Sequence, residues 1–169
     1  KRSMELYVRF REQLRERNSI ISSGSITNLT PVLQRNYRCN FHCIISQKIH
    51  LKSRIEYVTI DRESNSLEKG MLICQDILFR SKSSPIDFTF RYALFDTDSY
   101  SSRIYTFENN ALYVFSVPSY YYQGSRAYVL MRWNFLRKFD FWIRYGVQIF
   151  SNRSSIGSGA DEIAGNRKT

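Results

Sequence analysis

The chain contains two long segments in which apolar and polar side chains alternate, separated by Leu136-Arg137-Lys138. The first runs from Arg126 to Phe135 and the second from Phe139 to Phe150. Alternation with a period of two over about ten residues is typical of a β-strand with two unlike faces. Here one face is aliphatic and aromatic, and the other is rich in arginine and other polar residues. Transmembrane β-barrels have this pattern because their strands face lipid on one side and an aqueous interior on the other.

The same alternation predicts further strands over residues 4–17, 35–46, 49–62, 70–80 and 86–94, and a segment that is apolar on both sides and ends at Pro118 predicts one more over 111–117. Most of these strands exceed the five or six residues that are usual in soluble sheets, and they match the nine to eleven that cross a bilayer at a tilt. Long and short connections also alternate, as they do in outer-membrane barrels. The sequence therefore predicts an all-β fold over residues 1–169: an antiparallel transmembrane β-barrel with about eight strands present, as a portion of a larger barrel.

The strongly basic composition indicates which kinds of molecule the protein could bind. The net charge of +10 and the isoelectric point near 9.7 favour polyanions such as nucleic acid, lipid phosphates or acidic sugars. The arginines are spread over the predicted strands, which favours lipid and polysaccharide. No run of about twenty apolar residues occurs, so no membrane-spanning helix is predicted. Cys39 and Cys43 would lie about 13 Å apart along one strand, too far for a disulfide or a shared zinc ion without a bend.

Charged side chains on the polar faces of the predicted strands form the candidate site. They are Arg9, Arg11, Arg38, Arg54, Arg91, Arg126, Arg132, Arg144, Glu5, Glu56, Asp76, Asp87 and Asp140. A charge that faces lipid at the bilayer midplane costs about 2–4 kcal/mol, so we expect these groups to face the lumen. There they could pair across strands or line a path for anions, and in a narrow barrel pairing is favoured. The side chains expected to face lipid or a partner protein are Phe41, Ile55, Phe79, Phe90, Met131, Phe141 and Ile143.

No arrangement of residues typical of catalysis occurs in the sequence. Neither His42 nor His50 has a nucleophile at a spacing that suggests a triad. Asp96 and Asp98 lie in a predicted loop, where this spacing is more typical of a turn than of a cation site. We therefore expect no enzymatic activity, no cofactor and no metal site.

Three segments carry a resemblance to a known family: RYALFDTDSYSSRIYTFEN (91–109), ALYVFSVP (111–118) and IGSGADEIAGNRKT (156–169). They resemble the C-terminal region of helix-hairpin-helix-domain outer-membrane proteins of Bacteroidota. The resemblance implies an outer-membrane location and a barrel fold, and it implies little about activity because the role of that family is poorly defined. In that family a periplasmic helix-hairpin-helix region precedes the barrel, and one more strand follows the segment that matches residues 165–169. Helix-hairpin-helix units often bind nucleic-acid backbones, but with none in this chain nucleic acid is not an expected partner.

The expected function is that of a non-enzymatic structural or accessory barrel subunit in a Gram-negative outer-membrane assembly. Its expected partners are the lipid bilayer, lipopolysaccharide and other outer-membrane or periplasmic subunits. One alternative is a porin-like pore for small anions. Another is a soluble basic β-barrel that binds nucleic acid through its basic face and its tyrosines.

The predicted barrel would need further strands to close. Residues 151–169 are polar and rich in serine and glycine, and they predict a loop without a terminal aromatic strand. An open edge in hydrocarbon leaves unpaired backbone groups, each at a cost of several kcal/mol. We therefore expect residues before Lys1 or after Thr169, or a second chain, to close the barrel. No apolar region follows Lys1-Arg2-Ser3, so a signal peptide is not predicted within this sequence, and we expect a mature chain or a fragment.

Overall fold

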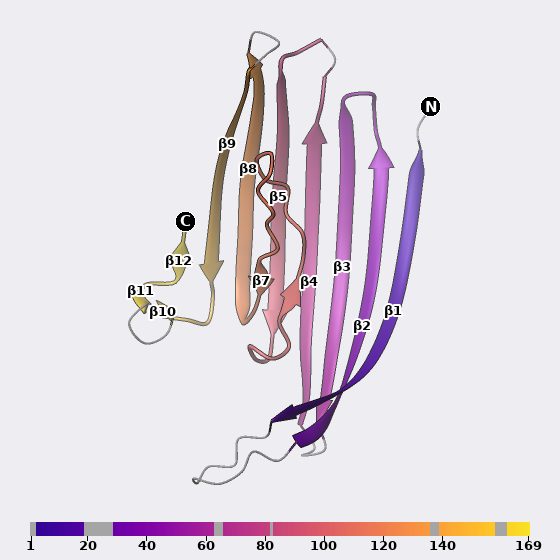
Figure 1. The fold of residues 1–169 in the computed structure, drawn as a ribbon, viewed down its shortest axis with the longest axis vertical. Coiled ribbons are helices and arrows are strands. Elements are labelled where there is room, and N and C mark those ends of the chain that lie inside the picture. Colours follow the sequence, from indigo (N-terminus) through magenta and orange to yellow (C-terminus); the bar gives the residue numbers. More distant parts are fainter. Residues whose placement is uncertain (1–2, 19–28, 63–65, 82, 136–138, 158–161) are drawn as a thin grey trace.

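A computed structural model of the chain describes residues 3–18, 29–62, 66–81, 83–135, 139–157 and 162–169. Most of them form one antiparallel sheet of eight strands, in the order β1-β2-β3-β4-β5-β8-β9-β12 (Figure 1). The strands are β1 (Met4–Asn18), β2 (Leu29–Ile44), β3 (Ile49–Arg62), β4 (Ser66–Phe79), β5 (Ile86–Thr97), β8 (Gln123–Phe135), β9 (Phe139–Phe150) and β12 (Arg167–Lys168). The prediction of an all-β antiparallel fold is confirmed. The part of the chain that the structure describes contains no helix of the length and hydropathy needed to cross a bilayer.

Each long strand pairs with its neighbour in the sequence, apart from one interruption. Between β5 and β8 the chain leaves the sheet as residues 98–122, which we call the insert. The insert carries a short antiparallel pair, β6 (Ile104–Tyr105) and β7 (Ser119–Tyr120), and runs over one face of the sheet (Figure 1). Beneath it β5 and β8 pair directly, from Ile86 opposite Trp133 to Asp96 opposite Gln123.

The register aligns apolar side chains of successive strands into one continuous surface, which we call the apolar face. One row joins Cys39, Ile55, Ile73 and Leu94 across β2 to β5, and another joins Phe79, Phe88, Met131 and Ile143 across β4 to β9. All the side chains expected to face lipid or a partner lie on this face: Phe41, Ile55, Phe79, Phe90, Met131, Phe141 and Ile143. Many of its residues are exposed, with Ile143 at 59%.

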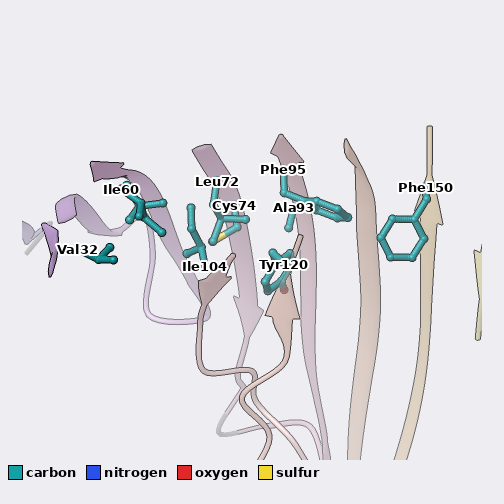
Figure 2. Packing of buried hydrophobic residues seen from close by; sticks show 10 residues of the cluster. Val32, Ile60, Leu72, Cys74, Ala93, Phe95, Ile104, Tyr120 and Phe150 are labelled. Atoms are coloured by element: carbon teal, nitrogen blue, oxygen red, sulfur yellow. The ribbon is translucent and has the colours of Figure 1, made fainter. Parts of the chain in front are cut away.

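The opposite surface, which we call the polar face, also holds the hydrophobic core of the molecule. Near the ends of β3, β4 and β5 that lie beside the insert, buried side chains on this face include Ile60, Leu72 and Phe95. Ile104 and Tyr120 of the insert pack against them (Figure 2). The Phe95 ring meets the Tyr120 ring edge-on at 5.4 Å between centroids. The insert is therefore fixed to the sheet by a small core at one end of the polar face.

The predicted strand over 111–117 is wrong. Within the insert, residues 111–113 form a bend and a turn, and Ser116 makes an isolated β-bridge with Glu108. Tyr113 has a φ of 66°, outside the range of a strand. Phe115 is 80% exposed, so the apolar character of this segment is not explained by burial against a neighbouring strand.

Several predicted boundaries also differ from the structure. β2 begins at Leu29 instead of residue 35, because it pairs with β1 as far as Asn18 opposite Leu29. β4 begins at Ser66 and β5 continues to Thr97, beyond the predicted limits 70 and 94. The predicted loop over 151–169 contains β10 (Ser155–Ile156), β11 (Ile163–Ala164) and β12. The predicted break at 136–138 lies outside the described residues.

Within the described residues the sheet does not close. β1 pairs only with β2, and β9 pairs with β8 and with the short β12. The structure thus establishes an open antiparallel sheet with one apolar and one polar face. The closure of a barrel by further residues or by a second chain stays a prediction.

Candidate functional site

All the charged side chains predicted for the site lie on the polar face, because directly opposed residues in an antiparallel sheet point to the same side. They come from β1 (Glu5, Arg9, Arg11), β2 (Arg38), β3 (Arg54, Glu56), β4 (Asp76), β5 (Asp87, Arg91), β8 (Arg126, Arg132) and β9 (Asp140, Arg144). The structure brings most of them together in separate clusters. Whether this face borders a lumen stays a prediction.

The first cluster is a buried ion pair in the middle of the sheet. Asp76 and Arg91 are opposite residues of β4 and β5, and the side chain of each is 7% exposed. Arg91 donates from Nε to Oδ1 at 2.5 Å and from Nη2 to Oδ2 at 2.6 Å. Two parallel hydrogen bonds of this kind fix the relative orientation of the two side chains and also strengthen their attraction. The remaining Nη1 of Arg91 donates to the carbonyl oxygen of Phe107 in the insert at 2.6 Å.

The second cluster joins Glu56 to Arg38 and Arg54. Arg38 donates from Nε and Nη2 to the two carboxylate oxygens of Glu56, at 2.9 and 3.0 Å. Arg54 lies on the same strand as Glu56 and also donates to it. Arg54 extends to the insert as well, with hydrogen bonds to Thr106 Oγ1 at 2.7 Å and to the carbonyl oxygen of Tyr105 at 3.2 Å.

The third cluster is centred on Glu108, a residue that the sequence did not single out. Its side chain has no exposed surface. It accepts hydrogen bonds from Arg126, at 2.7 Å from Nε and 3.1 Å from Nη2, from the hydroxyl of Tyr120 at 2.7 Å, and from Arg144. Burial alone would raise the pKa of Glu108, but hydrogen bonds from Arg126 and Tyr120 and the charges of Arg126 and Arg144 together hold that pKa below its ordinary value. Glu108 is therefore a buried carboxylate kept ionised by two arginines.

Arg62 of β3 donates to Ser101 Oγ near the start of the insert at 2.8 Å, and four further arginines of the sheet hold its middle. Arg54 of β3 and Arg91 of β5 bind its backbone or side chains, and Arg126 of β8 and Arg144 of β9 bind its Glu108. We call these four arginines and Glu108 the insert latch. Hydrogen bonds to charged groups contribute about 1.5–3 kcal/mol each, so the latch is a strong attachment for a segment with little regular structure.

The other predicted charges lie outside the latch. Arg132 pairs with Asp140 at 3.1 Å and with Asp87 at 3.9 Å, in an exposed part of the polar face. Glu5 approaches His42 at 3.9 Å. Neither Arg9 nor Arg11 forms an ion pair with a described residue, and the buried Nε of Arg9 has no hydrogen-bond partner there.

A cavity of about 440 Å³ is lined by the latch arginines Arg54 and Arg91 and by His42, Cys74 and Asp76 among others. His42 stacks on His50 with 5.7 Å between ring centroids. All three cysteines are free, and Cys74 is buried. Within the described residues no group of three or more His, Cys, Asp or Glu side chains could hold a metal ion. The expectation that the protein is not an enzyme stays a prediction.

In comparisons with known proteins, no family model, no curated protein and no solved structure matches this chain. The resemblance to helix-hairpin-helix-domain outer-membrane proteins therefore depends on the sequence segments alone and stays a prediction. What the fold and the site define is an antiparallel sheet with a continuous apolar face and a charged face covered by a latched insert.

Proposed function

We propose that this chain forms part of the wall of a transmembrane β-barrel in a bacterial outer membrane. In this proposal it acts as a non-enzymatic structural or accessory subunit, with the bilayer, lipopolysaccharide and other outer-membrane or periplasmic proteins as partners. The observation that carries the proposal is the apolar face, which extends from β1 to β9 and is exposed along most of its length.

The height of the apolar face supports membrane burial. On β9 every residue of this face from Phe139 to Val147 is apolar, namely Phe139, Phe141, Ile143, Tyr145 and Val147. At about 3.4 Å per residue this stretch is about 27 Å long, and a tilt of about 40° reduces its height to about 21 Å. The apolar band of outer-membrane barrels is about 25 Å tall, with aromatic residues at both limits. Tyr37 and Tyr57 lie toward one limit here, and Trp133 and Phe139 toward the other.

The width of the apolar face argues against the soluble alternative. Strands about 4.8 Å apart give the sheet from β1 to β9 a width of about 29 Å, and so a projected area of about 600–800 Å². The largest apolar patch of a typical soluble monomer is about 300–600 Å². A soluble form that binds nucleic acid would have to cover this face with another molecule.

The polar face supports a structural role over free conduction. Asp76, Glu56 and Glu108 form ion pairs with all five of the arginines around them, and the insert covers this part of the face. Arginines that are paired with carboxylates and covered by the insert are not available to bind an anion that passes along this face. The pore alternative is favoured by one observation, the pair Arg9 and Arg11, which have no ion pair in the described residues.

The two tryptophans test the proposal, because they lie on opposite faces. Trp133 belongs to the apolar face and is 39% exposed, whereas Trp142 lies on the polar face with the Arg132 guanidinium 5.7 Å from its ring centroid. The full chain would be reconstituted as Trp142→Phe and as Trp133→Phe in vesicles of lipids with brominated acyl chains. We expect strong fluorescence quenching when Trp133 remains and weak quenching when Trp142 remains. Equal quenching, or failure to associate with vesicles, would refute a membrane wall.

Conductance separates the structural role from the pore. In planar bilayers the reconstituted chain should show no steady anion-selective current. A stable anion current would establish the pore alternative while leaving the membrane location intact.

A further inference from the structure

A groove with an excess of positive charge lies on the polar face between β1, β2 and the β6 end of the insert. Its volume is about 250 Å³. Charged residues that line it are Arg9, Arg11, Arg15, Arg38, Arg103 and a single described carboxylate, Glu56. In the latch, by contrast, Arg91 pairs with Asp76, and Arg126 and Arg144 pair with Glu108.

The positive charge of this groove is not neutralised by its surroundings. Glu56 already binds both Arg38 and Arg54. Arg9 lies directly opposite Arg38 in the register, and like charges in that position destabilise a sheet. The buried Nε of Arg9 has no hydrogen-bond partner among the described residues, which carries a desolvation cost. An anion between β1 and β2 would relieve both unfavourable features.

The donors that surround the groove suit an anion with several oxygens. Arg103, which lines the groove, is held by hydrogen bonds from Nε to the Tyr105 hydroxyl at 2.6 Å and from Nη1 to the carbonyl oxygen of Tyr100 at 2.8 Å. Its guanidinium also lies over the Tyr100 ring, 4.2 Å from the centroid. Guanidinium groups present paired N–H donors that match phosphate oxygens and cannot lose their charge near neutral pH. Several such groups around one small groove favour a multiply charged anion over a single carboxylate.

We propose that this groove binds a soluble phosphate-bearing anion, with Arg9 and Arg11 as its principal ligands. A lipid phosphate has the same chemistry, but the groove lies on the polar face, away from the surface proposed to contact lipid. The inference is independent of conduction, since a bound anion can neutralise the wall without passing through it.

Titration calorimetry of the purified full chain in a nonionic detergent at low ionic strength tests this, with inorganic pyrophosphate as the probe. We expect saturable binding to one site, weakened at least tenfold in the double variant Arg9→Gln/Arg11→Gln. Arg132→Gln is the matched control, because it removes an arginine from the same face but outside the groove, and it should bind pyrophosphate as tightly as the unmodified chain.

A second variant keeps the test valid if the glutamine variant does not fold. Arg9→Lys/Arg11→Lys retains the charge but loses the paired donors, so it should fold and bind several-fold more weakly. Absence of saturable binding by the unmodified chain, or equal weakening in Arg132→Gln, would overturn the proposal. Phosphatidylglycerol added to the detergent micelles should not compete with pyrophosphate, and competition by it would overturn the choice of a soluble anion.

Discussion

Replacement of Glu108 by glutamine should release the insert while the sheet stays folded. Removing one partner of a buried ion pair costs about 3–5 kcal/mol, because the other charge is left without compensation. The lower end applies here, since the side chains of Arg126 and Arg144 keep 17% and 22% of their surface exposed and Arg126 retains its bond to Gln148. A loss of about 3 kcal/mol corresponds to a change of about 150-fold in the equilibrium between held and released insert.

Hydrogen exchange measured by mass spectrometry would detect this release. The amide of Glu108 donates to the carbonyl oxygen of Ser116 at 2.9 Å, and the amide of Asn109 donates to the Tyr128 hydroxyl at 3.1 Å. In the variant, peptides from the insert should exchange about 150-fold faster, while peptides from β4 and β5 keep their rates. Glu12→Gln is the control, because Glu12 pairs with Arg35 on an exposed edge where an ion pair contributes little. Unchanged exchange in the insert, or equal acceleration in β4 and β5, would refute the latch.

The remaining predictions concern pH, packing and the apolar face. Because the pKa of Glu108 is lowered in the folded state, its stabilising contribution is complete above the unfolded value of about 4.3 and is lost as pH falls through the folded pKa. Insert exchange, corrected for intrinsic rates, should therefore rise reversibly below about pH 4, and a pH-independent rate would contradict this. Gly70→Ala should lower the free energy of unfolding in urea by about 1–3 kcal/mol, because the new Cβ would meet the Ser102 carbonyl oxygen and lie 2.8 Å from Val58 Cγ1; an unchanged midpoint would contradict that packing. Ile143→Arg should reduce stability in vesicles by about 2–4 kcal/mol, whereas Asn134→Arg, on the polar face beside Asp140, should have little effect. Equal losses in these two variants would argue against lipid contact.

Strict alternation was sufficient to predict the long strands but not the insert. The predicted bounds 49–62 and 139–150 agree with β3 and β9. In both strands the alternation of apolar and polar residues continues until a short connection or a polar loop begins. Over 111–117 the side chains are apolar on both sides, so the local pattern contains no information about which face is covered. The structure leaves Tyr113 and Phe115 exposed there, and Ser116 makes an isolated bridge with Glu108 instead of joining a strand of the sheet.

The candidate site shows the same limit. The arginines of the polar face follow from the period of two, because each lies on a strand whose apolar side is evident. Glu108 lies in an irregular segment, and its partners Arg126 and Arg144 are 18 and 36 residues further along the chain. Contacts of this kind depend on how the insert crosses the sheet, and the spacing of residues within one segment of the sequence does not predict that course.

The order of the strands has a consequence for how the sheet can assemble. From β1 to β5 and from β8 to β9, each strand lies beside the one that precedes it in the chain. The entropy lost in closing a loop rises slowly with its length, by about 0.6 kcal/mol per doubling, so even the detour through the insert adds little to the closure of β5 on β8. Chains dominated by pairing between sequence neighbours need no distant segments to meet before the first contacts form. A chain that becomes available from one end can therefore add its strands one hairpin at a time, each strand covering the edge left by the last.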